Sequence, residues 1–215
     1  MSDRRGAGRC LARPRCYLAG ALMVTDPPPS SPLARLDYAA SEASTALPLP
    51  ASGALGERVR PFLAALESGR ATSVRETGGA LLAALASFYR VETPRLIVPG
   101  VRPHEVDGGV CVYQLFGDYE PATAQIRVFL RTAIKGQIVR PRAFLCTLLH
   151  EFCHHLDLRF FGRRSSYHTR GFFGRVDDLY HRALGTPEAE RRPLRWVQSG
   201  EVWRIDWPAT RAPRR

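Results

Sequence analysis

The stretch TLLHEFCHHLDLRFFGRRSSYHTRGFF, residues 147–173, holds four of the six histidines of the chain and decides its fold. From Pro141 onward the apolar side chains recur at spacings of three and four: Phe144, Leu145, Leu148, Leu149, Phe152 and Leu156. This period predicts one long helix that ends before Gly162. Proline suits its first turn, because the backbone N–H that proline lacks has no helical partner there.

The flanking segments add further helices. A second helix is predicted over residues 168–184, with Ser165 and Ser166 as candidate N-caps and Gly185 at its end. Residues 55–69 and 73–90 also show apolar residues at helical spacing. We expect both to be helices that support the first one.

Short runs rich in β-branched residues predict the strands. Residues 94–100 form one strand, and residues 110–117 and 124–133 are expected to pair across the turn residues DYEPAT as a hairpin or meander. Residues 193–207 alternate about a Ser-Gly turn and predict a last hairpin. Helices and strands together predict an α+β fold with a small sheet.

The composition changes near Leu55. Residues 1–54 are rich in Pro, Ala and Ser and are expected to form a disordered N-terminal arm. Residues 55–208 are expected to form one domain, and residues 209–215 a basic tail. The basic start and the short apolar run after it resemble a signal peptide, but no small-residue cleavage site follows, and Met23 is an alternative start.

His150, Glu151 and His154 form the pattern H-E-x-x-H. On a helix, residues four apart lie on one face, so both imidazoles could reach a single zinc ion. Glu151 lies beside the first ligand, where its carboxylate could hold a water molecule and take its proton. Zn²⁺ is therefore the expected cofactor.

A catalytic zinc ion usually takes three protein ligands and keeps one position for water. His168 is the predicted third ligand, because the chain can turn at Gly162 and return. Asp157 is the competitor, and is expected instead to orient an imidazole through its distal nitrogen. His155 lies off the ligand face, and His181 is expected to be a surface or capping residue.

These residues carry a family resemblance. HEFCHHLD followed by HTRGFFGRVDDL resembles the SprT-like (Spartan-type) zinc metallopeptidases, in which H-E-x-x-H is followed by H-G-x-x-F. His168 and Phe172 match the second motif, with Thr169 where glycine is usual. The segment FGDYEPATAQIRV is similar to the strand–turn–strand that many compact zincins place before the metal helix. The resemblance covers about residues 80–185.

The resemblance implies a compact zincin fold: a small twisted antiparallel or mixed sheet, the H-E-x-x-H helix, and a following helix that carries the third ligand. It also implies that an edge strand, here residues 124–130, aligns an extended peptide above the zinc ion. The cysteines needed for the C-terminal zinc ribbon of some members are absent, and no ubiquitin- or clamp-binding motif is evident.

The expected chemistry is hydrolysis of a peptide bond in a protein or peptide substrate. Glu151 would be the general base, taking a proton from a zinc-activated water and passing it to the leaving amine. Tyr167, Arg170 or Tyr180 could stabilise the oxyanion, and all three stay open. A non-catalytic alternative is a zinc-stabilised binding domain in which Asp157 completes the ligand set.

The net charge of +11 raises a second alternative, a DNA-associated protease of the same family. Arginines far outnumber acidic residues from Arg159 onward, and Trp196, Trp203 and Trp207 lie among them, a pattern that suits single strands. Against this, the tryptophans alternate and could be core residues. Lys135 is the single lysine, and a GC-rich coding sequence would give the same arginine bias without any partner.

The five cysteines form no C-x-x-C pair, which predicts reduced thiols and a cytoplasmic protein. No apolar run is long enough to span a membrane, so no membrane partner is expected. The sequence does not indicate an oligomeric state.

Overall fold

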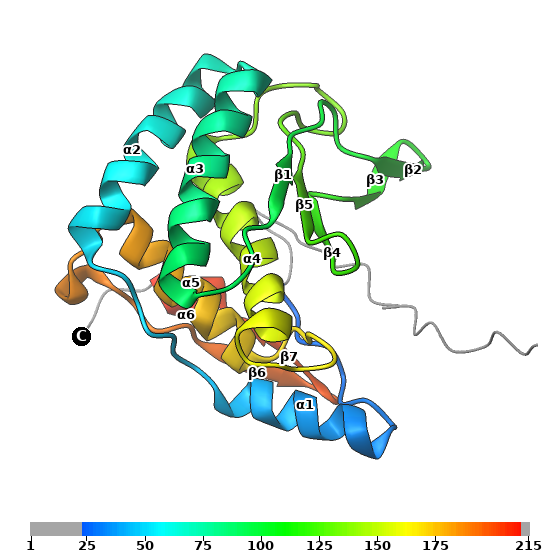
Figure 1. Ribbon diagram of the computed structural model, residues 1–215. Coiled ribbons are helices and arrows are strands. Elements are labelled where there is room, and N and C mark those ends of the chain that lie inside the picture. The colour runs from blue at the N-terminus through cyan, green and yellow to red at the C-terminus, as the bar shows by residue number, and fades with distance from the viewer. Residues whose placement is uncertain (1–22, 212–215) are drawn as a thin grey trace, which may run out of the picture.

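The computed structural model describes residues 23–211, and the predicted α+β class is confirmed (Figure 1). Six α-helices lie in that range, two more than the sequence predicted. Helix α4, Pro141–Arg159, lies at the centre of the fold and is buried along most of its length. Helices α2, Ser52–Ser68, and α3, Ala71–Tyr89, pack side by side, and α2 also contacts α4 and α5, Arg170–Leu184. None of the described helices is long and apolar enough to cross a bilayer.

Helix α3 runs without interruption through Gly78 and Gly79. A Cβ at Gly78 would lie 2.6 Å from Leu96 and 2.9 Å from Phe62, whereas one at Gly79 would meet nothing within 4 Å. Gly78 therefore allows α2 and the sheet to approach α3 closely. This close packing holds β1, Arg95–Ile97, against α3.

The main sheet has three strands in the order β1, Arg95–Ile97, then β5, Gln125–Val128, then β4, Gly117–Glu120. β1 pairs with β5 in parallel, and β4 pairs with β5 antiparallel, so the sheet is mixed. The prediction that residues 124–130 are the edge strand is wrong, because β5 has neighbours on both sides. Among the described residues β4 pairs only with β5, which makes β4 an edge.

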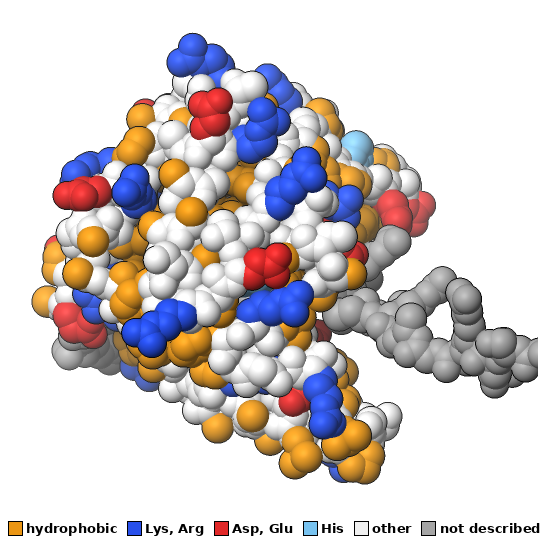
Figure 2. Space-filling view, viewed as in Figure 1, with side chains coloured by type: hydrophobic (Ala, Val, Ile, Leu, Met, Phe, Trp, Pro, Cys, Tyr) orange, Lys and Arg blue, Asp and Glu red, His pale blue; other side chains and the backbone are white. Residues whose placement is uncertain are grey.

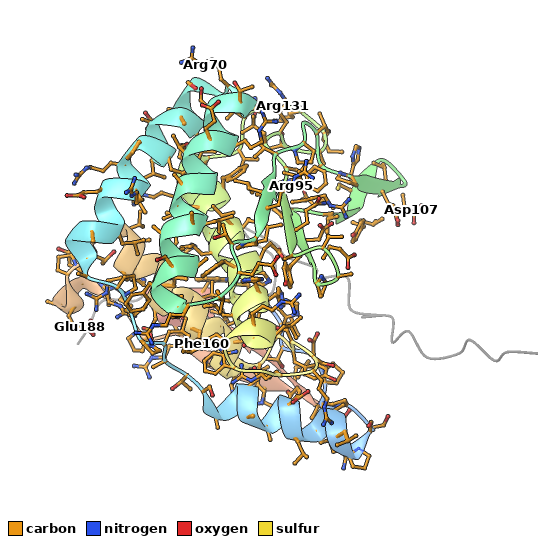
Figure 3. All side chains as sticks on the ribbon, in the orientation of Figure 1. Arg70, Arg95, Asp107, Arg131, Phe160 and Glu188 are labelled. Carbon is orange, nitrogen blue, oxygen red and sulfur yellow. The ribbon has the colours of Figure 1, made fainter. Side chains whose placement is uncertain are left out.

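The predicted pairing of residues 110–117 with residues 124–133 holds only at its end, where Gly117 pairs with Val128, and is wrong for residues 110–114. Gly117–Glu120 itself is the strand that pairs with β5, and the turn is shorter than expected, with Ala124 at a φ of 46°. Strand β3, Val110–Gln114, pairs instead with β2, His104–Asp107. These two form a separate hairpin that projects from the body, with Asp107 at its tip (Figures 1 and 3).

The predicted last hairpin is present as β6, Trp196–Ser199, and β7, Val202–Ile205, with Gly200 in the turn at a φ of 61°. The short helix η1, Glu188–Glu190, precedes it, and α6, Trp207–Arg211, follows. Residues 209–211 of the predicted basic tail thus belong to a helix. Residues 212–215 lie outside the described residues.

The expectation of a disordered arm over residues 1–54 does not hold for residues 23–54. They contain α1, Pro32–Ala43, which packs on α5, and they bury Met23 and Leu47 in the core. The contact with α5 is made by small residues: a Cβ at Gly171 would lie 2.0 Å from the carbonyl oxygen of Ser41, and one at Gly174 2.9 Å from that of Thr45. The arm predicted for residues 1–22 lies outside the described residues.

Candidate metal centre

Three imidazoles meet at one point in the structure. His150 and His154 lie one turn apart on α4, and His168 comes from the loop just before α5. Their Nε2 atoms are 3.0 Å apart for His150 and His168, 3.1 Å for His154 and His168, and 3.2 Å for His150 and His154. The structure therefore brings the predicted trio together as a group that could hold a metal ion.

Hydrogen bonds on the far side of two rings indicate where their protons lie. Ser166 donates its only hydroxyl proton to Asp157 at 2.7 Å, so it accepts one from Nδ1 of His154, also at 2.7 Å. Nδ1 of His168 lies 3.4 Å from the carboxylate of Asp26, which accepts when ionised. Both rings thus carry their proton on Nδ1 and turn a bare Nε2 lone pair inward.

Burial favours the neutral form of His150 and His154. Burial lowers the pKa of His150 and of His154 well below the ordinary value, and the neighbouring His168 lowers both further. Burial alone would raise the pKa of Asp26, but the hydrogen bonds with the side chain and backbone of His168 outweigh it and lower that pKa. Neutral imidazoles with converging lone pairs repel one another unless a cation lies between them.

Phe172 and Phe173, in the first turn of α5, form an aromatic wall around the histidines. The ring centroid of Phe172 lies 4.5 Å from that of His154 and 5.0 Å from that of His150, and Phe173 stacks on His168 at 5.7 Å. The side of the group formed by His150 and His168 is buried, while His154 is partly exposed. The group is therefore largely shielded from solvent.

Glu151 is 0% exposed, and neither of its carboxylate oxygens has a hydrogen-bond partner among the described residues. Burial raises its pKa well above the ordinary value, and the charge of Asp118 raises it further. Strand β4 can lie this close because Gly117 has no side chain: a Cβ there would lie 3.3 Å from Cγ of Glu151 and 2.8 Å from Thr147. A buried carboxylate without a partner is costly and points to a polar or cationic group that the site binds.

Asp157 does not join the histidines. One oxygen accepts from Arg163 and, at 2.7 Å, from Arg175, and the other accepts from Ser166. Asp157 therefore orients His154 through Ser166 and not by direct contact. With both oxygens engaged in this way, the alternative of a closed site with Asp157 as fourth ligand has no support in the geometry.

The cap of α5 is Thr169, and the prediction of Ser165 or Ser166 is wrong. The hydroxyl of Thr169 accepts from the N–H of Phe172 at 3.0 Å and bonds Ser41 of α1 at 2.9 Å. Ser166 is instead part of the bridge between Asp157 and His154. Thr169 therefore both caps α5 and ties it to α1.

Two further histidines that were weighed as candidates, His155 and His181, do not join the trio. Nε2 of His155 contacts the carbonyl of Glu92 at 2.8 Å, and its Nδ1 contacts the hydroxyl of Tyr119 at 2.9 Å. Since a carbonyl can only accept, Nδ1 of His155 accepts from Tyr119, and the ring ties β4 to α4. His181 is partly exposed in the last turn of α5, 3.5 Å from Asp177.

The three oxyanion candidates differ in their surroundings. Arg170 pairs with Glu42 of α1, and its guanidinium lies over the ring of Trp203 at 4.2 Å, so its charge is already engaged. Burial raises the pKa of Tyr180, and the charge of Cys146 raises it further. Tyr167 directly precedes His168 and remains the candidate nearest to the trio in sequence.

Sequence reasoning missed Asp26 and Arg175. Asp26 contacts His168, which lies 142 positions away, and no local sequence pattern predicts such a contact. Arg175 is 1% exposed and lies one turn after Phe172 on the apolar face of α5. A charged residue on an apolar stripe is a signal for a buried ion pair, so Arg175 could have been found.

Comparison with known protein families, with curated proteins and with solved structures gives no match for this chain. The likeness to SprT-like enzymes is therefore carried by the motifs alone. The chemistry of the site has to be argued from its own geometry.

Proposed function

We propose that this chain is a zinc-dependent metallopeptidase that hydrolyses peptide bonds, with His150, His154 and His168 as the zinc ligands and Glu151 as the general base. The observation that carries the proposal is the triangle of Nε2 atoms with sides of 3.0 to 3.2 Å. Tetrahedral zinc with bonds of about 2.05 Å needs nitrogen atoms about 3.3 Å apart. Three imidazoles with one position left for water are the usual set of a catalytic zinc ion.

Glu151 supplies the acid–base chemistry. Zinc bound here would polarise the scissile carbonyl and acidify a water molecule. The carboxylate of Glu151 lies in a dry setting, and neither of its oxygens has a hydrogen-bond partner in the part of the chain that the structure describes, so it would be the group that accepts a proton from a bound water molecule and delivers it to the leaving amine. Because burial raises its pKa, this carboxylate is a stronger base than an exposed one.

The substrate is an extended peptide that pairs with the edge strand β4. Exposed strand edges bind peptides through main-chain hydrogen bonds. β4 lies against α4 at Gly117, next to the general base, so a peptide on this edge would bring a carbonyl group near the three histidines. This arrangement of mixed sheet, α4 and α5 is the basis for assigning a compact zincin fold of the SprT-like type.

The test is metal content and cleavage in paired variants of the full chain. We expect the wild type to carry about one zinc ion per chain and to cleave an unfolded substrate such as casein. Glu151→Gln should keep the metal and lose cleavage by at least about 10²-fold, the size expected for a general base. Glu67→Gln, which changes an exposed carboxylate on α2, is the matched control and should retain activity.

Retained proteolysis in Glu151→Gln would contradict the assigned base, and a folded wild type that takes up no transition metal would refute the whole proposal. Zinc bound at full occupancy without cleavage of any substrate would favour the non-catalytic binding domain. Elemental analysis and the cleavage assay therefore separate the two.

The nucleic-acid alternative is weaker. Trp196 packs on Phe173 and Trp203 lies under Arg170, so both rings already have partners inside the protein. On the face seen in Figure 2, arginine side chains are dispersed among apolar and acidic groups and form no single patch.

We propose the cytoplasm as the location of the protein, because Cys111, Cys146 and Cys153 are free cysteines, as is usual in that reducing compartment.

A further inference from the structure

Asp26 makes three contacts with one predicted ligand. Its Oδ2 accepts a hydrogen bond from the backbone N–H of His168 at 2.9 Å and lies 3.4 Å from Nδ1 of the same residue. Its own N–H donates to the carbonyl of His168 at 2.8 Å. The carboxylate thus holds both the backbone and the ring of His168.

The position of Asp26 is itself fixed by the C-terminal hairpin. Residues 23–25 run along β7: Thr25 donates its N–H to the carbonyl of Trp203 at 2.7 Å, and its hydroxyl accepts from the N–H of Trp203 at 2.8 Å. Ile205 donates to the carbonyl of Met23 at 3.0 Å. Tyr38 of α1 donates to the carbonyl of Asp26 at 3.0 Å. The segment that carries Asp26 is therefore held in place by hydrogen bonds to both β7 and α1.

The three predicted ligands have unequal support. His154 is held through Ser166, while Nδ1 of His150 has no partner in the part of the chain that the structure describes. His168 alone faces a carboxylate directly, and it is also the one that lies in a loop and not on α4. A loop ligand gains most from an outside constraint, because no helix fixes its orientation.

We infer that Asp26 is a positioning residue that holds His168 with its proton on Nδ1 and its Nε2 toward His150 and His154, and so sets the metal affinity of the site. This inference rests on the proposed metal site. A carboxylate behind a ligating imidazole fixes its tautomer and raises its basicity, and its removal typically weakens metal binding by about 10- to 100-fold.

Asp37 provides the matched control. It lies on α1 in the same N-terminal segment, and its Oδ2 accepts from the backbone N–H groups of Arg164 and Ser165 at 3.0 and 3.2 Å. Asp37→Asn removes one charge and loosens the same loop without touching His168. Asp26→Asn keeps an acceptor for the His168 backbone, whereas Asp26→Ala removes it.

The experiment measures zinc affinity of the full chain by competition with a chelator, with the visible absorption of the Co²⁺ form as a second readout. We expect Asp26→Asn to weaken zinc binding by about 10-fold and Asp26→Ala by up to about 100-fold, with altered Co²⁺ bands. Asp37→Asn should stay within about threefold of the wild type. Equal affinity of Asp26→Asn and the wild type, or an equal loss in Asp37→Asn, would overturn the inference.

Thermal unfolding of the metal-free variants shows whether each is folded. If the Asp26 variants do not fold, the zinc-loaded wild type still decides the matter: nitrogen-resolved NMR should show an exchange-protected Nδ1–H on His168, and its absence refutes the role of Asp26. Absence of metal binding in the wild type would instead refute the proposed function, so the two failures are distinguishable.

Discussion

Replacing Gly171 by alanine should destabilise the protein, although alanine normally favours a helix over glycine by about 1 kcal/mol. A Cβ at this position would lie 2.0 Å from the carbonyl oxygen of Ser41 and 2.7 Å from that of Glu42. Contact needs about 3.2 Å, so α1 must retreat by about 1 Å, since these are backbone atoms that no side-chain rotation can move. Overpacking of this kind costs about 1 to 3 kcal/mol.

The retreat of α1 would also loosen hydrogen bonds that reach it from the centre of the protein. Arg175 donates to the carbonyl of Ser41 at 3.0 Å, and Arg163 donates to that of Ala40 at 3.1 Å. Weakening these charged bonds brings the expected total loss of unfolding free energy to about 2 to 4 kcal/mol. With an m-value of about 2 kcal/mol/M, the urea midpoint should fall by about 1 to 2 M.

The control for this substitution is Gly79→Ala in α3. A Cβ there meets nothing within 4 Å, so alanine should leave the urea midpoint unchanged or raise it. If Gly171→Ala were as stable as Gly79→Ala, α1 would not be docked on α5. The expectation that residues 1–54 are a loose arm would then stand for residues 23–54 as well.

Three other outcomes follow from the same structure. Asp157→Ala should lower the unfolding free energy by about 3 to 5 kcal/mol, because the buried Arg163 and Arg175 lose the carboxylate that they share. An unchanged urea midpoint would contradict a stabilising role for these two ion pairs. Gly117→Ala should lower the unfolding free energy by about 1 to 3 kcal/mol, because the added Cβ would lie 2.8 Å from both Arg127 and Thr147. It should also reduce cleavage at constant zinc content. Full activity in this variant would show that β4 does not need to approach α4 so closely. Removing the metal with a chelator should lower the melting temperature by about 10 °C, since a ligand at a thousand times its dissociation constant adds about 4 kcal/mol, and zinc but not calcium should restore it.

The helices that carry the histidines were predictable because their signals are local. The apolar period of residues 144–156 fixes α4, and the spacing between His154 and His168 allows the chain to return. The sheet was harder to predict. β5 is central only because β1 pairs with it in parallel across a long stretch of chain, and no short pattern encodes a parallel partner.

The residues that contact the histidines from behind could not be predicted from the sequence, for a different reason. Asp26 contacts His168 across 142 positions of sequence. The hydroxyl of Ser166 could either cap α5 or bridge Asp157 and His154, and the sequence does not distinguish the two roles. α1 had a start signal in Ser31 and Pro32, but its residues Leu33 and Leu36 are exposed, so no apolar stripe marks it as a packed helix. It is held by backbone contacts at glycines of α5, which composition does not reveal.

The charge balance around Asp157 explains why α1 belongs to the site. Arg163 and Arg175 are both buried and share this one carboxylate, which leaves an excess positive charge near His154. A buried positive charge would oppose the binding of a metal cation. The two guanidinium groups also donate to carbonyls at the C-terminal end of α1, which is the negative end of that helix. Docking of α1 therefore offsets the excess charge, and a chain that lacked this helix would bind a cation less well even with all three histidines in place.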